Sequence, residues 1–234
     1  MPYCLKERAT YLRELADDPD CDRTTLYNTY IQFKTLNLIS SRWQSIYEVY
    51  IRPWLQIEER TLTLLDVGCG GGDIALAIAE WVAQDNLSLK ITAIDTDIRA
   101  INFTNSQSNP HHVEFLNVST SQLVAQNRSF DFVISNHFLH HLNSNELKDI
   151  LIESEHLATK MVLFNDIERS ALLYYYYAAL GLVLEPFFPQ SFIWVDGCRS
   201  IRRGYTRSEL LTIANDHWQV KRLFFSRLLL IYTP

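Results

Sequence analysis

The spacing of apolar and polar positions is helical up to about residue 57, and from residue 62 strand-like and helix-like segments follow one another in turn. Residues 7–57 place apolar side chains at helical spacing, with a break at the acidic stretch 17–20, which predicts two or three helices. From residue 62, apolar runs of strand length alternate with amphipathic stretches. The predicted strands are 62–67, 89–95, 113–118, 130–135 and 160–165, and the predicted helices are 73–84, 97–107 and 143–158. Right-handed crossovers make this an α/β fold with a doubly wound parallel sheet.

The C-terminal part of the pattern predicts a helix followed by a hairpin. Thr206, with Glu209 three residues later, forms a capping box for a helix over 206–215. Two apolar segments follow, 218–225 and 228–233, and only two residues separate them, so they are expected to pair antiparallel. The complete prediction is a mostly parallel seven-stranded sheet with an antiparallel C-terminal hairpin.

Aromatic residues concentrate in two segments outside the predicted sheet. Large aromatic side chains lie near one stripe of the helical segment 1–57, which is expected to pack on the domain or to cover its site. The insertion 167–205 contains four consecutive tyrosines, and it overhangs the carboxyl ends of the strands, where ligands bind in open α/β sheets. We therefore divide the chain into residues 1–57 and a domain 58–234 with an inserted aromatic cap. Tyr174 and Tyr177 are candidate substrate contacts, and simple packing of the tyrosines is the alternative.

Composition narrows the classes of function. A chain of 234 residues, 47% hydrophobic, suffices for one large α/β domain. The net charge of −6 argues against a nucleic-acid partner. Four cysteines without C-x-x-C spacing and an N-terminus without an apolar signal core favour a reducing cytoplasm. The longest apolar stretch, 171–184, is shorter than the ~20 residues of a membrane span. The sequence allows a homodimer.

The most specific motif is a strand that ends in a glycine-rich loop, LLDVGCGGG at residues 64–72, with a helical pattern directly after it. Glycine has no Cβ and tolerates positive φ, so the backbone can turn sharply and let a ligand approach closely. Asp95 ends the next strand, where an open α/β sheet presents a carboxylate to paired ribose hydroxyls. The junction therefore predicts a site for a nucleoside-bearing cofactor.

Over about residues 60–166 this arrangement resembles class I S-adenosylmethionine (SAM)-dependent methyltransferases, whose pattern is an acid, x-Gly-x-Gly-x-Gly and a second acid that ends the next strand. The resemblance implies a Rossmann-like methyltransferase fold, SAM as the cofactor and S-adenosylhomocysteine (SAH) as the product. It also implies contacts to the methionine part of the cofactor from Asp66, Gly68, Gly70, Gly72 and Ser135, to the ribose from Asp95, and to the adenine from Thr96 to Ile98, Asn117 and Val118. An NAD-dependent oxidoreductase shares the early pattern, but Asp73 replaces its third glycine and would repel a pyrophosphate.

Three histidines follow the fourth predicted strand in the run SNHFLHHL, residues 135–142. Methyl transfer to a hydroxyl needs alignment and removal of a proton, which an imidazole can accept. On a helical turn His137 and His141 would share a face while His140 points elsewhere. We expect His141, and after it His137, to be the base, and His140 to lie beside the substrate, packed or hydrogen-bonded to backbone. No metal is expected, because the nearest further histidines, at 111 and 112, begin another strand.

Three stretches, 135–142, 17–22 and 202–206, resemble bacterial methyltransferases that tailor polyketide or phenolic natural products and, more distantly, ubiquinone and menaquinone methyltransferases. Residues 135–138 lack the prolines of the families that methylate base or amide nitrogens. The prediction is O-methylation of a phenolic or polyketide-type small molecule. C-methylation of an activated ring and a non-catalytic SAM-binding role are the alternatives. Arg202 lies in a basic cluster and is a candidate contact for an anionic substrate, with solvated ion pairs as the alternative.

Overall fold

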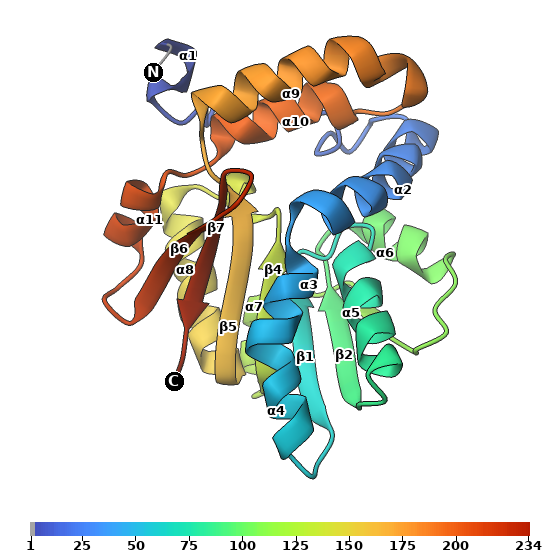
Figure 1. The fold of residues 1–234 in the computed structure, drawn as a ribbon, viewed down its shortest axis with the longest axis vertical. Helices are drawn as coiled ribbons and strands as arrows, with labels where there is room; N and C mark the ends of the chain where they lie inside the picture. Colours follow the sequence, from blue (N-terminus) through green and yellow to red (C-terminus); the bar gives the residue numbers. More distant parts are fainter. Residues whose placement is uncertain (1–2) are drawn as a thin grey trace.

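The computed structural model describes residues 3–234, and a seven-stranded sheet forms its centre (Figure 1). The strand order is β3-β2-β1-β4-β5-β7-β6, in which neighbours from β3 to β5 pair parallel and β7 pairs antiparallel with both β5 and β6. The strands are β1 Leu62–Val67, β2 Leu89–Ile94, β3 Glu114–Leu116, β4 Phe130–Asn136, β5 Ala158–Ile167, β6 Trp218–Leu223 and β7 Arg227–Tyr232. The predicted doubly wound sheet with an antiparallel C-terminal hairpin is confirmed.

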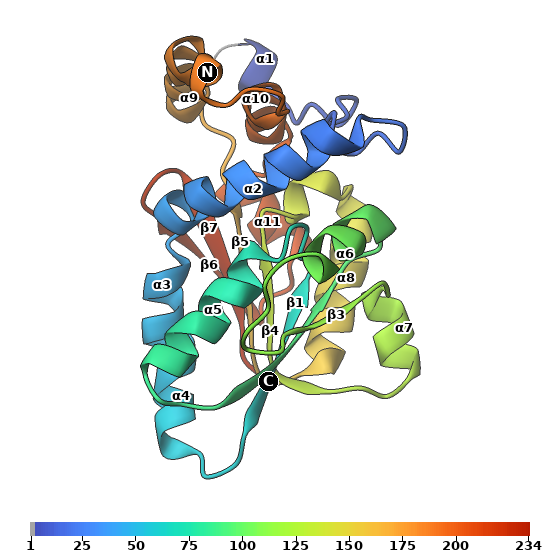
Figure 2. The same cartoon turned by 90° about the vertical axis from the view of Figure 1, so that its right-hand side faces the viewer.

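Helices cover both faces of the sheet because successive strand residues point to opposite sides. Leu64 packs into the core on one face, beneath α3 (Trp43–Ile46), the π-helical turn η1 (Tyr47–Ile51), α4 (Arg52–Ile57) and α5 (Asp73–Gln84). Leu65 packs into the core on the other face, beneath α7 (Thr120–Ala125), α8 (Ser144–Leu157) and α11 (Arg207–Ile213). Figure 2 shows these two layers, with α6 (Ile98–Asn105) beside the glycine loop. These helices therefore cover the two faces of the sheet and not the edge at which the parallel strands have their carboxyl ends (Figure 2).

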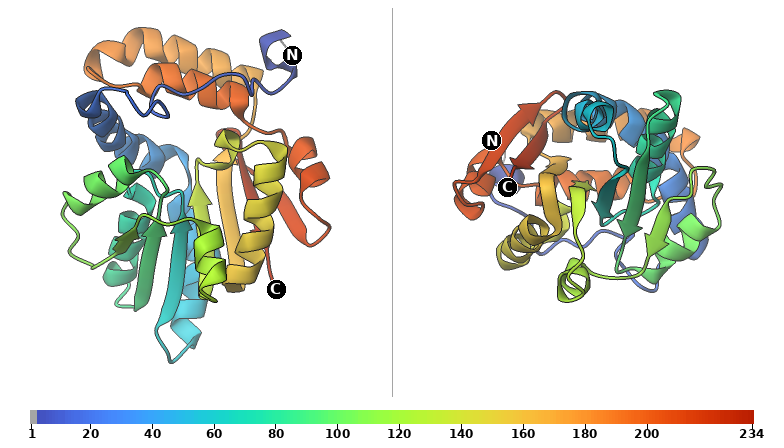
Figure 3. Two further views of the ribbon diagram at one scale, coloured as in Figure 1. Left: turned by 180° about the vertical axis from the view of Figure 1, so that it is seen from behind. Right: turned by 90° about the horizontal axis from the view of Figure 1, so that it is seen from below.

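Three segments lie above those carboxyl ends. Helix α2 (Arg23–Ser40) crosses over them, and α9 (Ala171–Leu184), the turn η3 (Glu185–Phe187) and α10 (Ile193–Arg203) form the inserted cap (Figures 1 and 2). After the short α1 (Tyr3–Lys6), residues 7–22, here called the N-terminal strap, run along α10 (Figure 3). Asp196 of α10 accepts hydrogen bonds from the backbone amides of Leu15 and Ala16, at 2.7 and 2.9 Å. The strap and the cap are thus joined directly over the sheet.

The structure corrects several local predictions. The hairpin turn is 224–226 rather than 226–227, because Phe225 and Ser226 take positive φ angles and Arg227 begins β7. The six-residue helix α7 was not predicted, since it is too short to show a helical period, although Ser119 and Gln122 form its capping box. Helix α10 was also missed within the insertion.

The division of the chain into residues 1–57 and a domain 58–234 stays a prediction. No helix within residues 3–234 is both long and apolar enough to cross a membrane.

Candidate active site

A cavity of about 360 Å³ lies at the carboxyl ends of β1, β2 and β4, a volume within the range of small-molecule sites. The N-terminal strap, α2, the glycine loop, the turn after β2 and the histidine run each form part of its wall. The lining residues are Glu14, Ala16, Asp17, Tyr30, Phe33, Asn37, Gly68, Cys69, Gly70, Gly71, Asp73, Asp95, Thr96, Asp97, Arg99, Asn136, His137, Phe138 and His141. Segments from residue 14 to residue 141, far apart in the sequence, therefore meet around one space.

The glycine loop forms the floor of this cavity. Gly68, Gly70 and Gly72 have φ angles of +67°, +50° and +74°, in the left-handed region that side chains disfavour. The backbone amides of Gly68 and Cys69 both donate to the carbonyl of Ile94, at 2.9 and 3.0 Å, which anchors the loop to β2. A Cβ on Gly68 would lie 2.6 Å from the Phe138 ring, whereas a Cβ on Gly70 would meet no described atom within 4 Å. A ligand can therefore approach the backbone at Gly70.

These two glycines predict different effects of the same substitution. Gly68→Ala is expected to lower the free energy of unfolding by more than the roughly 1–2 kcal/mol that left-handed strain costs, because its methyl group also meets Phe138. Gly70→Ala adds the strain alone, and its methyl group enters the cavity, so it should mainly weaken ligand binding. Urea unfolding and calorimetric SAH titration of both variants separate the two effects. Equal stability losses would contradict the observed packing.

Asp95 joins the glycine loop to the turn after β2. Its two carboxylate oxygens accept hydrogen bonds from the backbone amides of Gly70 and Asp97, at 2.9 and 2.8 Å. Asn117 donates to the backbone carbonyl of Asp95 at 2.9 Å. Burial raises the pKa of Asp95, so its charged form gains from any hydrogen-bond donor or cation that enters the cavity. Each oxygen keeps a lone pair for such a ligand.

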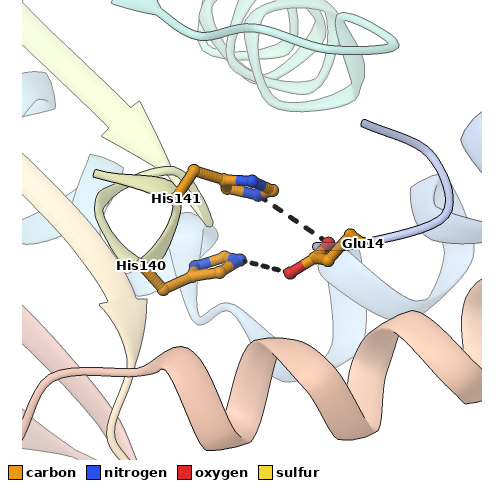
Figure 4. A group of neighbouring side chains, drawn as sticks. All are labelled: Glu14, His140 and His141. Carbon is orange, nitrogen blue, oxygen red and sulfur yellow. Dashed lines mark ion pairs between the residues drawn. The ribbon is translucent and has the colours of Figure 1, made fainter. Parts of the chain in front are cut away.

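The three histidines do not share one helical turn, so the expectation that His137 and His141 share a helix face is wrong, although both line the cavity and His140 lies outside its lining. His137 has a φ of +58°, and Leu139–His141 is a 3-10 turn. The His140 ring packs between the other two, with its centroid 4.6 Å from that of His137 and 4.2 Å from that of His141. Both His140 and His141 point toward Glu14 of the N-terminal strap (Figure 4).

His140 is fully buried between two carboxylates and lies outside the cavity lining. Its Nδ1 is 2.8 Å from Oδ1 of Asp166, and its Nε2 is 3.2 Å from Oε1 of Glu14. Burial alone would lower the pKa of His140, but these two carboxylates raise it to about 9. Against the effect of burial, the His140 imidazolium holds the pKa of Asp166 well below its usual range, and His141 together with His140 does the same for the pKa of Glu14. The arrangement is a buried ion network that ties the strap to β5.

The same network bears on metal binding. Two groups within residues 3–234 bring three ligand atoms close enough for a metal ion: Glu14, His140 and His141, and His137, His140 and Asp166. Both groups require His140, and a metal ligand must be a neutral imidazole. The carboxylates of Asp166 and Glu14 lie 2.8 and 3.2 Å from the two ring nitrogens of His140, a geometry that fits an ion network at this place.

His141 is the histidine whose ring reaches the cavity with a carboxylate behind it. Its Nδ1 lies 3.1 Å from Oδ2 of Asp17, and its Nε2 lies 3.8 Å from Oε2 of Glu14. His137 also lines the cavity, but burial and the positive charges of His140 and Arg227 lower its pKa to about 3. A group with so low a pKa accepts a proton poorly at neutral pH. The geometry therefore favours His141 as a base.

The remaining predicted residues lie away from the cavity lining. Asp66, Gly72 and Ser135 are buried beneath it, with Ser135 Oγ donating to the Val67 carbonyl, and Asn117 and Val118 follow β3. In the cap, the Tyr177 hydroxyl donates to the carbonyl of Ile193 at 2.8 Å, Arg202 donates to the Tyr11 hydroxyl at 2.9 Å, and Tyr174 stacks edge-on against Tyr175. The cofactor and substrate roles of all these residues stay predictions.

Sequence reasoning missed the residues that the N-terminal strap contributes. Glu14 and Asp17 line the cavity, and Arg99 donates to the carbonyls of Ala16 and Asp18, at 3.0 and 2.6 Å, which holds the strap against the turn after β2. The acidic stretch 17–20 is interpreted above as a helix break and, within 17–22, as part of the resemblance to natural-product methyltransferases, with no site role for Asp17. No local pattern marks these residues, because their partners lie far away in the sequence.

Comparisons with known proteins agree on one fold. Residues 64–159 match a family model described as a methyltransferase domain. The plantazolicin methyltransferase BpumL, in complex with a pentazolic desmethylPZN analog and SAH, has a TM-score of 0.59 at 13% identity, over 94% of this chain and 93% of that one. Magnesium protoporphyrin IX methyltransferase (ChlM) from Synechocystis PCC 6803 with bound SAH has a TM-score of 0.52 at 14% identity, over 90% and 98%. At these identities the likeness shows the fold alone.

Two curated relatives match shorter stretches. Ribosomal protein L11 methyltransferase of Campylobacter concisus (strain 13826) is 30% identical over 103 residues, which is 43% of this chain and 35% of that protein. The corresponding protein of Campylobacter fetus subsp. fetus (strain 82-40) is 29% identical over 86 residues, 37% of this chain and 29% of that protein. The chain thus spans about a third of the length of the curated relatives it matches.

Proposed function

Because residues 64–159 match a family model described as a methyltransferase domain, we propose that the protein transfers a methyl group from SAM to a hydroxyl oxygen of a small phenolic or polyketide-type acceptor. The predicted resemblance to class I SAM-dependent methyltransferases is confirmed by the family match and the fold. BpumL and ChlM, both of which have been crystallised with SAH, are methyltransferases of a plantazolicin and of a magnesium porphyrin. Likeness to ubiquinone and menaquinone methyltransferases stays a prediction.

The charge of the cavity wall carries the proposal. Five carboxylates line the cavity, and Arg99 is the one lysine or arginine among the described lining residues; the carboxylates belong to Glu14, Asp17, Asp73, Asp95 and Asp97. Opposite charges attract strongly where burial lowers the effective dielectric constant. SAM carries a sulfonium, an ammonium and a carboxylate, so its net charge is positive and this wall favours it, whereas the wall would repel the pyrophosphate of NAD. The cavity therefore fits SAM better than the dinucleotide.

Asp95 and the glycine loop would hold the cofactor. The free lone pairs of the Asp95 carboxylate can accept from two ribose hydroxyls, and the open space at Gly70 lets the ligand lie against the backbone. Thr96 and Asp97 line the cavity beside Asp95, where the predicted adenine contacts begin. Bound SAM supplies an electrophilic methyl group, whose bond to sulfur breaks as the bond to the acceptor oxygen forms.

His141 would take the proton that the acceptor hydroxyl loses. The Asp17 carboxylate accepts from Nδ1–H of His141, which leaves the lone pair on Nε2 to receive the proton. Glu14, 3.8 Å from Nε2, then stabilises the imidazolium that forms. Phe33 and Phe138 supply apolar surface in the same cavity for a flat acceptor.

Isotope labelling tests this function against its alternatives. The protein is incubated with SAM carrying a ¹³C methyl group and, in separate reactions, with catechol, resorcinol or hydroquinone, and SAH formation and the methylated carbon are followed by mass spectrometry and NMR. A methyl group bound to oxygen supports the proposal. A methyl group bound to a ring carbon would contradict it in favour of C-methylation. SAM binding without SAH formation from any of the three would favour a non-catalytic SAM-binding role.

The cytoplasmic location and the homodimer that the sequence suggests stay predictions.

A further inference from the structure

The outer face of α9 is an apolar stripe. Every exposed position between 171 and 184 belongs to it: Leu172, Tyr175, Tyr176, Ala179, Leu182 and Val183. The spacing is i, i+3, i+4, i+7, i+10 and i+11, which is the pattern of a helix face that packs on another helix. Residues 171–184 include no charged side chain. We call these six residues the α9 stripe.

Helix α9 packs on the protein with its opposite face. The ring of Tyr177 contacts Trp194 of α10 with centroids 5.2 Å apart, and Gly181 lies against the same tryptophan. Figure 1 shows α9 as the outermost element above the sheet. Leu172 and Leu182 are 81% and 85% exposed, so none of the described residues covers the stripe.

The exposed area matches what a protein interface needs. At about 150–250 Å² per large side chain, the exposed fractions of the stripe and of nearby Phe187 leave roughly 600–1,000 Å² of mostly apolar surface in solvent. A monomeric soluble protein rarely exposes more than a few hundred Å² in one such patch. A stable dimer covers about 800 Å² on each partner.

We propose that a second copy of this chain docks on the α9 stripe, with the two α9 helices antiparallel about a two-fold axis at Ala179. The smallest side chain of the stripe then lies at the axis, where two helices approach most closely. Residues equally far from Ala179 in opposite directions meet across the axis, so Tyr176 contacts Leu182 of the other copy and Tyr175 contacts Val183. Such reciprocal pairs are the rule of a two-fold interface.

Charge favours a second copy over a membrane as the occupant. Helices that lie on membrane surfaces carry lysine or arginine beside their apolar face. Helix α9 carries neither, the exposed Glu185 follows its last turn, and the whole chain has a net charge of −6. The uncharged stripe allows two acidic chains to meet without like charges in the contact.

Sedimentation equilibrium of the full chain, at concentrations from nanomolar to micromolar, tests the interface. We expect the wild type to reach twice its mass of 27.3 kDa. Leu182→Glu and Tyr176→Lys should each raise the dimer dissociation constant at least about 100-fold, because each places two unpaired charges in the apolar contact. The matched control is Ile152→Glu, an exposed apolar residue of α8, which should leave the dimer unchanged.

The double variant Tyr176→Lys with Leu182→Glu tests the register. Positions 176 and 182 are six residues apart within one helix, too far to pair there, but they meet across the proposed axis. The double variant should therefore regain dimerisation, and circular dichroism should show that every variant is folded. A monomeric wild type, a dimer insensitive to Leu182→Glu, or a monomer that instead floats with phosphatidylcholine vesicles would each overturn the proposal.

Discussion

His141→Ala is expected to lower kcat for methyl transfer by about 10²–10⁴-fold, the usual contribution of a positioned general base. The substitution removes the His141 imidazole from the cavity wall but leaves the glycine loop and Asp95 in place, so SAH should still bind. Turnover is followed as SAH release with whichever of the three phenols the protein methylates. Calorimetric SAH titration of the variant checks that the cofactor site is intact.

Chemical rescue separates a base from a packing residue. Added imidazole should restore part of the activity of His141→Ala, because it can occupy the vacated space and accept the proton. Asp17→Asn should lower kcat by a smaller factor, since Asp17 acts through Nδ1 of His141 and does not receive the proton itself. His137→Ala is the comparison for the second candidate. A His141→Ala variant with wild-type kcat would show that proton removal does not depend on this residue.

Asp166→Ala is expected to lower the free energy of unfolding by about 3–5 kcal/mol, the typical effect of leaving one partner of a buried ion pair alone. Asp166 accepts hydrogen bonds from both the backbone amide and the side chain of His140, at 2.9 and 2.8 Å, and it is almost fully buried. Without it, the His140 imidazolium keeps Glu14 as its one remaining buried counter-charge among the described residues.

Urea denaturation measures this loss, and Asp166→Asn is the matched control. The amide oxygen can still accept a hydrogen bond from His140, so the smaller change should cost less than removal of the whole side chain. A loss below about 1 kcal/mol in Asp166→Ala, comparable with a surface substitution, would contradict the assignment of a charged, buried network.

Local sequence patterns were sufficient to predict the sheet and the glycine loop that forms the floor of the cavity. Strand spacing, the glycine run and the acid at the end of β2 are features of neighbouring residues, and the structure places Gly68, Gly70 and Asp95 around one cavity. The capping box at Thr206 and Glu209 begins α11 for the same reason. Such elements follow from interactions within a few residues, which the sequence displays directly.

The rest depended on contacts between distant parts of the chain. Glu14 and Asp17 become site residues only because Asp196 and Arg99 hold the N-terminal strap over the cavity. The orientation of the histidine rings follows from the left-handed backbone at His137, which a helical interpretation of the run could not include. Tertiary contacts thus set the geometry of the cavity wall, while the local pattern predicted where the cavity lies.

Calorimetric titration of SAH and of NAD into the wild type and into Asp95→Ala tests whether the cavity is a SAM site. Asp149→Ala, an exposed acid of α8, serves as the matched control. We expect micromolar binding of SAH alone, retained in the control and lost in Asp95→Ala, because Asp95 lines the cavity and its two oxygens hold the glycine loop at Gly70 and the turn after β2 at Asp97. Binding of NAD alone, or of neither ligand, would contradict a SAM-dependent methyltransferase.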